Sequence, residues 1–213
     1  MSETSRPIGC VIMASGLARR FGSNKLLADF GGRPLLCRAL DATDTPQLAC
    51  RIVVTRSAEV ETLCQTLGVA CLRHALLGRN DTVRLGLEAL LTLQPGLAGC
   101  IFLPGDQPLL RRETVEALVC AFVADTRTQK ETERDIFRLA FQAENDPEPL
   151  VGSPVLFGCG YFSALRTLPE GKGGSVLLRR YPERVCNVFT ADRAELLDAD
   201  TPEALRELKQ FLI

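Results

Sequence analysis

The sequence predicts an α/β fold, a three-layer α-β-α sandwich around a mainly parallel, Rossmann-like sheet with a small inserted hairpin. Two observations predict it. Apolar runs rich in β-branched residues alternate with stretches of helical spacing, and this rhythm is interrupted once, between residues 137 and 157. The chain has 213 residues, of which 46% are hydrophobic, so it can fill one core, and we expect a single domain over residues 1–213.

The expected strands are apolar runs bounded by Gly, Pro or polar positions. They cover residues 8–14, 51–55, 69–72, 99–103, 136–141 and 185–189. Stretches of a different period separate most of them, which is the pattern of βαβ units. We therefore expect most of these strands to run parallel to one another.

The expected helices cover residues 34–42, 58–67, 81–93 and 113–124, where apolar residues recur at intervals of three and four. Pro34 suits the first turn of its helix, and Asp81 or Thr82 suits an N-terminal cap. The clearest helix is the last one. It opens with Thr201 as N-cap and Pro202 as the first helical residue.

The interruption at residues 137–157 consists of a strand, the polar turn ENDPEP and the strand-like run VGSPVLF. Two strands joined by a polar turn form a hairpin. We expect this hairpin to flank an active-site cleft.

The charge balance excludes whole classes of partner. Lys and Arg number 25 against 26 Asp and Glu, which gives a net charge of -1 and no overall field to attract nucleic acid or an anionic membrane. No basic segment followed by a long apolar stretch opens the chain, and no apolar run approaches the roughly 18 residues that a spanning helix needs. We expect a cytoplasmic protein without nucleic-acid or membrane partners.

The nine cysteines are scattered singly among apolar neighbours, no CxxC pair occurs, and His74 is the sole histidine. This spacing does not fit a zinc site or a disulfide framework, so the cysteines are interpreted as small buried hydrophobes in a reducing compartment. His74 follows the expected strand at residues 69–72 and is interpreted as its cap, not as part of a catalytic triad.

The loop after the first strand, within VIMASGLARRFGSNK at residues 11–25, is a candidate phosphate site. Ala14, Ser15 and Gly16 are small enough for a ligand to approach the main chain, and Arg20 and Lys25 can meet phosphate oxygens together with backbone N–H groups. The loop fits neither G-x-x-x-x-G-K-[ST] nor G-x-G-x-x-G. A triphosphate suits this geometry. A solvated loop with cations is the alternative.

A carboxylate follows the expected strand at residues 99–103. In the segment CIFLPGDQP, Asp106 comes directly after Pro104 and Gly105. A carboxylate at the end of a central strand can hold Mg²⁺, which takes one or two protein carboxylates together with substrate phosphate oxygens. The alternative is an aspartate that only forms a turn.

Several segments together resemble a known family. MASGLARRFGSNK is similar to the L-A-A-G-x-[SG]-x-R-[MF]-G-x-x-K signature of sugar-nucleotide-type pyrophosphorylases and cytidylyltransferases. PGDQP resembles the metal-binding segment of their molybdenum-cofactor branch. GRNDTVRLGLEAL, GSPVLF, LPEGKGGSVLLRR and LDADTPEAL resemble further elements of that family in the same order. The group that the chain most resembles is the molybdenum cofactor cytidylyltransferases, which have the nucleotide-diphospho-sugar transferase fold.

The resemblance implies a nucleotidyl transfer. A phosphate oxygen of molybdopterin attacks the α-phosphorus of CTP, pyrophosphate leaves, and the dinucleotide cofactor passes to a molybdenum hydroxylase. Lys25 would bind the α-phosphate, Arg20 the β- and γ-phosphates, and Asp106 the Mg²⁺.

Further contacts are expected around the base and the metal. Main-chain groups at Ala14 and Ser15, and the hydroxyl of Thr82, would contact the base, although Thr82 has a competing role as a helix cap. Asp198 is a second candidate metal ligand or a packing residue in its loop.

Other functions remain open at this point. Ser153 stands where the family pattern has His or Asn, which leaves the acceptor undecided. Guanylyl transfer to molybdopterin, nucleotidyl transfer to a sugar or polyol phosphate, and non-catalytic delivery of a cofactor are the alternatives.

Overall fold

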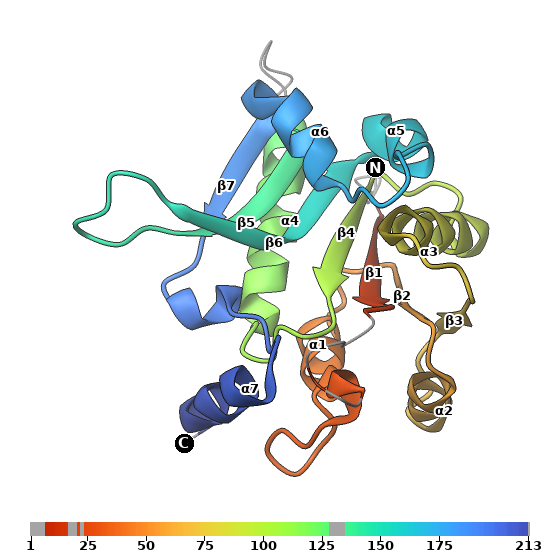
Figure 1. The fold of residues 1–213 in the computed structure, drawn as a ribbon. Helices are drawn as coiled ribbons and strands as arrows, with labels where there is room; N and C mark the ends of the chain where they lie inside the picture. Colours follow the sequence, from red (N-terminus) through yellow and green to blue (C-terminus); the bar gives the residue numbers. More distant parts are fainter. Residues whose placement is uncertain (1–6, 17–20, 22–23, 128–134, 213) are drawn as a thin grey trace.

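The computed structural model of the chain describes residues 7–16, 21, 24–127 and 135–212. Its centre is a seven-stranded sheet in the order β3-β2-β1-β4-β6-β5-β7 (Figure 1). The strands are β1 (Ile8–Ala14), β2 (Cys50–Thr55), β3 (Cys71–Arg73), β4 (Gly99–Pro104), β5 (Ile136–Phe141), β6 (Leu150–Gly158) and β7 (Val185–Phe189).

Most neighbouring strands run parallel, as the alternating pattern predicted. β1 pairs in parallel with both β2 and β4, β2 with β3, and β5 with β7. β6 runs antiparallel to β4 and to β5. The predicted hairpin is therefore formed by β5 and β6 and belongs to the main sheet, with β6 between β4 and β5. Only its connecting turn, at residues 142–149, projects from the body of the molecule (Figure 1).

Helices cover both faces of the sheet, which gives the predicted three layers. Their bounds are α1 (Leu36–Ala42), α2 (Ala58–Thr66), α3 (Arg79–Leu93), α4 (Arg112–Arg127), α5 (Phe162–Arg166), α6 (Ser175–Arg180) and α7 (Pro202–Leu208). α1, α2 and α4 pack on one face, and α3, α5 and α6 pack on the other. α7 packs with Phe30 and Leu35 in a smaller cluster.

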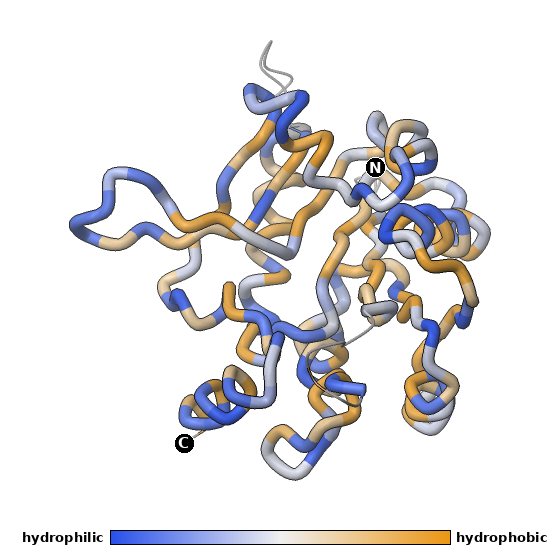
Figure 2. The backbone as a smooth tube through the Cα atoms, viewed as in Figure 1, coloured by the Kyte–Doolittle hydropathy of each residue, from blue (hydrophilic) through white to orange (hydrophobic). Residues whose placement is uncertain are grey.

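Alternation along each strand divides the core between the two faces. In β1, Cys10 and Ile12 belong to one buried cluster and Val11 to the other, because successive side chains of a strand point to opposite faces. Figure 2 shows hydrophobic residues concentrated in the central strands and hydrophilic residues at the projecting turn. In the described part of the chain, no helix is both long enough and apolar enough to cross a membrane.

Three sequence predictions about local structure need correction. Helix α1 begins at Leu36, so Pro34 lies before its first turn and forms an isolated bridge with Asp29. The third strand is Cys71–Arg73, shorter and later than the predicted 69–72. Helix α3 begins at Arg79, two residues before the predicted start, so neither Asp81 nor Thr82 is its N-cap. Gly78 occupies that position, and Asp81 reaches back from the first turn to accept a hydrogen bond from the Gly78 N–H at 3.1 Å. The predicted Thr201 cap of α7 is confirmed, since its hydroxyl accepts from Ala204 N–H at 3.1 Å.

Candidate functional site

The loops after β1 and β4 lie together because these strands are parallel neighbours. The Gly105 N–H donates to the Met13 carbonyl at 3.0 Å. A Cβ atom on Gly105 would lie 3.1 Å from a Leu36 methyl and 3.3 Å from that same carbonyl, so any larger residue here would crowd its neighbours. This packing holds Asp106 beside the end of β1.

The segment that leads into α7 packs against the loop after β4. The Ala199 N–H donates to the Asp106 carbonyl at 2.9 Å, which brings Asp198 and Asp200 to the end of β4. A stretch from the C-terminal part of the chain thus joins two loops from its first half at one edge of the sheet.

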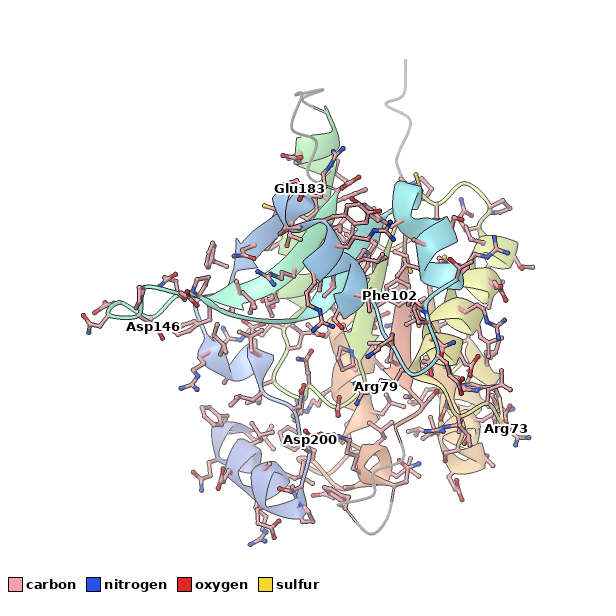
Figure 3. All side chains as sticks on the ribbon, turned by 45° about the horizontal axis from the view of Figure 1, so that its top comes forward. Arg73, Arg79, Phe102, Asp146, Glu183 and Asp200 are labelled. Carbon is pink, nitrogen blue, oxygen red and sulfur yellow. The ribbon has the colours of Figure 1, made fainter. Side chains whose placement is uncertain are left out.

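A cavity of about 770 Å³ opens at this edge. Its lining carries both signs of charge: the carboxylates of Asp106, Asp198 and Asp200, and the guanidinium groups of Arg56, Arg79 and Arg138. Figure 3 labels three of the lining residues, and they come from three different parts of the chain: Arg79 from the start of α3, Phe102 from β4 and Asp200 from the segment before α7. Ser15, Gly16, Thr82 and Ser153 also line the cavity.

Lys25 lies behind the carboxylates. It is the first residue of a 3-10 turn, Lys25–Leu27, which Asn24 caps by accepting a hydrogen bond from Leu26 N–H at 3.2 Å. Its ammonium group forms ion pairs with Asp106 and, at 2.9 Å, with Asp200. Lys25 is only 9% exposed. Burial alone would lower its pKa, but the hydrogen bonds and charges of Asp106 and Asp200 outweigh burial, so the pKa of Lys25 is raised and the ammonium is charged.

The three carboxylates carry more negative charge than Lys25 neutralises. Burial, together with the charges of Asp106 and Asp200, raises the pKa of Asp198 to about 6, while a hydrogen bond from Gln107 acts in the opposite direction. Gln107 is itself buried, and its side-chain oxygen has no hydrogen-bond partner in the described structure. Crowded carboxylates of this kind fit a bound cation.

The donor set does not amount to a complete metal cage. Among the described residues, no group of three or more His, Cys, Asp or Glu side chains is arranged to hold a metal ion by itself. A site of one or two carboxylates that is completed by substrate phosphate oxygens is the form that Mg²⁺ takes in nucleotide enzymes. Asp106 and Asp198 fit that form.

Hydrogen bonds fix the other wall of the cavity, at Ser15. The Ser15 hydroxyl donates to the Val54 carbonyl at 3.1 Å, and the Ser15 carbonyl accepts a hydrogen bond from Arg56. Because that hydroxyl proton is used, His74 Nε2, 3.0 Å away, must be the donor to Ser15 Oγ. Burial and the nearby charge of Arg56 lower the pKa of His74, which favours this neutral form.

The predicted site residues are placed as follows. Ser15, Gly16, Thr82, Asp106 and Asp198 line the cavity, and Lys25 contacts it through its carboxylate partners. Thr82 lies inside the first turns of α3 and is buried.

Two other predicted site residues remain, Ala14 and Arg20. Ala14 does not line the cavity: it is buried at the end of β1, and its carbonyl accepts a hydrogen bond from the Thr55 hydroxyl at 3.1 Å. Arg20 lies outside the residues that the structure describes, as does Arg19.

Four charged residues at the cavity were not predicted: Arg56, Arg79, Arg138 and Asp200. The sequence did carry a usable signal for Asp200, which lies two residues after Asp198 and directly before the Thr201 cap. Arg56 follows the end of a predicted parallel strand, which is also a position where ligands bind. Arg138 sits within a strand, and its sequence context carried no such signal.

Comparison with known proteins identifies the type of domain. A family model described as "MobA-like NTP transferase domain" matches residues 10–185. The chain is 35% identical over 130 residues to the bifunctional protein GlmU of Anaeromyxobacter sp. strain K, a match covering 57% of this chain and 26% of GlmU. It is 26% identical over 111 residues to a probable molybdenum cofactor guanylyltransferase of Pyrococcus horikoshii, covering 52% of this chain and 54% of that protein.

Solved structures share the fold along nearly the whole chain. A homolog of Mycobacterium tuberculosis Rv0371c, from Mycobacterium sp. strain JC1, superposes with a TM-score of 0.75 at 24% identity, over 98% of this chain and 97% of that one. CMP:2-keto-3-deoxy-manno-octonic acid synthetase in complex with CTP gives 0.71 at 16% identity, over 97% of both chains. M. tuberculosis Rv0371c in complex with manganese gives 0.67 at 20% identity, over 96% and 98%.

Proposed function

Because the chain belongs to the MobA-like NTP transferase domain family, we propose that it is a nucleotidyltransferase that moves CMP from CTP to a phosphate-bearing acceptor and releases pyrophosphate. The acceptor we propose is the molybdopterin-bound molybdenum cofactor, and the product would be a dinucleotide cofactor for a molybdenum hydroxylase. One observation carries the proposal: a lysine paired with two of three carboxylates at the edge of a cavity of about 770 Å³, directly beyond the parallel strands.

The reaction needs no nucleophile from the protein. An acceptor phosphate oxygen forms a bond to the α-phosphorus, the bond from that phosphorus to the bridging oxygen breaks, and pyrophosphate leaves with the electron pair. In such transfers the protein contributes positioning and charge neutralisation. Lys25, which is charged, is proposed to bind the α-phosphate where charge develops, and Arg20 is proposed to bind the β- and γ-phosphates.

Asp106 and Asp198 are proposed to hold a divalent cation, Mg²⁺ in the first instance. When bound, this ion would neutralise charge on the phosphates and orient them. A bound cation would also account for Asp198, a third carboxylate beside the two that pair with Lys25. The known complex of the similar Rv0371c with manganese supports a divalent metal.

The base is proposed to bind between Ser15, Gly16 and Thr82. The hydrogen bond from the Ser15 hydroxyl to the Val54 carbonyl and the one from His74 Nε2 to Ser15 Oγ hold this wall rigid, as a binding site that reads a base edge requires. The CTP complex of the similar synthetase supports CTP as the donor. The similarity to a probable molybdenum cofactor guanylyltransferase supports a second candidate, guanylyl transfer from GTP.

The test is a pyrophosphate-release assay with CTP, GTP, ATP and UTP, each with and without molybdopterin and with Mg²⁺ present or chelated. The proposal expects release that requires CTP, molybdopterin and the metal together. Release with GTP alone among the nucleotides would favour the second candidate. Binding of CTP with no pyrophosphate under any condition would favour a cofactor-delivery protein and contradict catalysis.

A further inference from the structure

Arg138 lies at the far side of the cavity from the proposed base site. It belongs to β5, whereas Ser15 and Arg56 follow β1 and β2, and in the sheet order β4 and β6 lie between these two groups. The carboxylates follow β4 or reach it from the segment before α7. The charged residues of the cavity are thus arranged along the sheet with guanidinium groups at both sides and carboxylates in the middle.

The strand register puts Arg138 on the cavity face of the sheet. Arg138 pairs with Val155, and Val155 pairs with Phe102 on β4, so the three residues form one row across neighbouring strands. All three line the cavity.

A register shift directly after Arg138 changes the pairing. The next residue, Leu139, pairs with Gly152, which leaves Ser153 and Pro154 without a cross-strand partner in this ladder. Irregularities of this kind redirect side chains and are frequent beside active sites. Ser153 lines the cavity as well, so a hydroxyl and a guanidinium face the same space.

The charge of Arg138 has no counter-ion in the described structure. Its Nε–H donates to the neutral Asn187 Oδ1 at 2.8 Å, and no described carboxylate lies within ion-pair distance of it. Burial lowers the pKa of Arg138, which reflects the cost of keeping this guanidinium charged in the cleft. The two terminal nitrogens form a planar fork suited to a phosphate or carboxylate.

We propose that Arg138 binds an anionic group, a phosphate or a carboxylate, on the acceptor substrate. The inference rests on the proposed function and deepens it, because it restricts the acceptor to molecules that carry an anion on the β5 side of the cavity. Asn187 acts as a positioning residue that holds the guanidinium by its Nε. The two terminal guanidinium nitrogens of Arg138 then remain available to bind the ligand.

The experiment measures binding of inorganic phosphate, used as the probe for the acceptor anion, to protein saturated with Mg²⁺ and the non-hydrolysable analogue α,β-methylene-CTP. The variants are Arg138→Gln, which removes the charge, and Arg138→Lys, which keeps it. Arg206→Gln is the matched control, since Arg206 is an exposed arginine on α7 that pairs with Glu203 outside the cavity lining. Thermal unfolding of each variant verifies that it is folded.

Arg138→Gln is expected to weaken phosphate binding about 10- to 100-fold, as for loss of a charged hydrogen-bond donor. Arg138→Lys should weaken it less, and Arg206→Gln should bind phosphate as the wild type does. The affinity for the nucleotide analogue should stay the same in all three variants. Unchanged phosphate binding in Arg138→Gln, or no measurable phosphate binding by the wild type at millimolar concentration, would overturn the proposal.

The competing source of the same chemistry is the triphosphate tail of the nucleotide. If Arg138→Gln weakens binding of the nucleotide analogue and leaves phosphate binding intact, Arg138 belongs to the triphosphate site and the acceptor assignment is wrong. Failure of the proposed function looks different. In that case either no nucleotide binds to the wild type or CTP binds without release of pyrophosphate, and phosphate titrations still report on Arg138 in both cases.

Discussion

The ammonium group of Lys25 lies 2.9 Å from a carboxylate oxygen of Asp200, a residue 175 positions further along the chain. The same ammonium pairs with Asp106, so residues from three distant segments meet at one buried charge. Asp200 is on the solvent side of this cluster, with 60% of its side chain exposed, against 18% for Asp106. A ligand that enters from the cavity therefore meets carboxylates first and the lysine behind them.

We predict that Lys25→Met lowers the rate of pyrophosphate release by about 100-fold or more, because it removes a charged donor from the reacting phosphates. It should also lower the melting temperature, since Asp106 loses its partner in a poorly hydrated place. The exposed pair of Lys209 with Asp29, at 3.0 Å, supplies the control, and Lys209→Met should change neither quantity appreciably.

A double variant separates the two roles of Lys25. Lys25→Met combined with Asp106→Asn removes both buried charges, so the melting temperature should recover relative to Lys25→Met alone. Turnover should not recover. Recovery of both quantities would mean that Lys25 serves only to stabilise the fold.

We predict that Asp106→Asn removes most of the metal dependence of CTP binding. Amide groups are weaker ligands for Mg²⁺ than carboxylates, so the affinity for CTP should differ little between Mg²⁺ and a chelator. Titration calorimetry of CTP in both buffers measures this. Asp41→Asn, which breaks an exposed pair with Arg33, is the control. A large Mg²⁺ effect that persists in Asp106→Asn would exclude this carboxylate as a metal ligand.

Asp198 and Asp200 should respond differently to the same substitution. Asp198→Asn should raise the Mg²⁺ concentration needed for half-maximal turnover, because Asp198 is a proposed ligand. Asp200→Asn should reduce turnover at saturating Mg²⁺ and leave that concentration nearly unchanged, because Asp200 positions Lys25. Metal titrations of both variants decide between these roles. Identical responses would contradict the assignment of separate roles.

Thr82→Val should weaken CTP binding about 3- to 10-fold through loss of one hydroxyl hydrogen bond. The change conserves shape, and Thr82 is buried at the cavity wall. Thr92, on the same helix α3, is exposed, and its hydroxyl donates to the Glu88 carbonyl at 3.0 Å. Thr92→Val is therefore the matched control. Equal CTP affinity in the wild type and Thr82→Val would remove Thr82 from the base site.

Gly86 on α3 tests how closely this helix packs on the sheet beneath the site. A Cβ atom at this position would lie 2.6 Å from a Val11 methyl and 3.0 Å from one of Val54. Overpacking in Gly86→Ala should cost about 1–3 kcal/mol and the better helix propensity of Ala should return about 1 kcal/mol, so the free energy of unfolding should fall by up to about 2 kcal/mol. Gly96 has open space around it, so Gly96→Ala should be nearly neutral in the same urea titration.

Much of the fold followed from local patterns, because strands buried on both faces give apolar runs that stand out from helical spacing. β1, β5 and β7 have the predicted bounds. The short helices α5 and α6 were not predicted, since five or six residues give too little periodicity to recognise. The start of α3 was misplaced because Asp81 caps from inside the helix, where sequence alone suggested a cap before it.

The predicted part of the candidate site depends mainly on strand ends, although Arg56 was missed at one of them, and Asp200 and Arg138 were missed because their placement depends on tertiary packing. Asp106 follows directly from its position after an apolar strand. Asp200 reaches Lys25 only because the Ala199 N–H binds the Asp106 carbonyl, a contact between segments far apart in sequence. Arg138 is placed at the cavity by the register of β5 and β6, which no local pattern contains.

If Lys25 and Asp106 converge on one metal-loaded nucleotide tail, a crystal structure with Mn²⁺ and α,β-methylene-CTP will show it through the anomalous signal of the metal. We expect a metal peak about 2.1 Å from a carboxylate oxygen of Asp106, as for a small divalent ion, with the α-phosphate in contact with Lys25 Nζ. A metal bound elsewhere, or a triphosphate that touches neither residue, would contradict it.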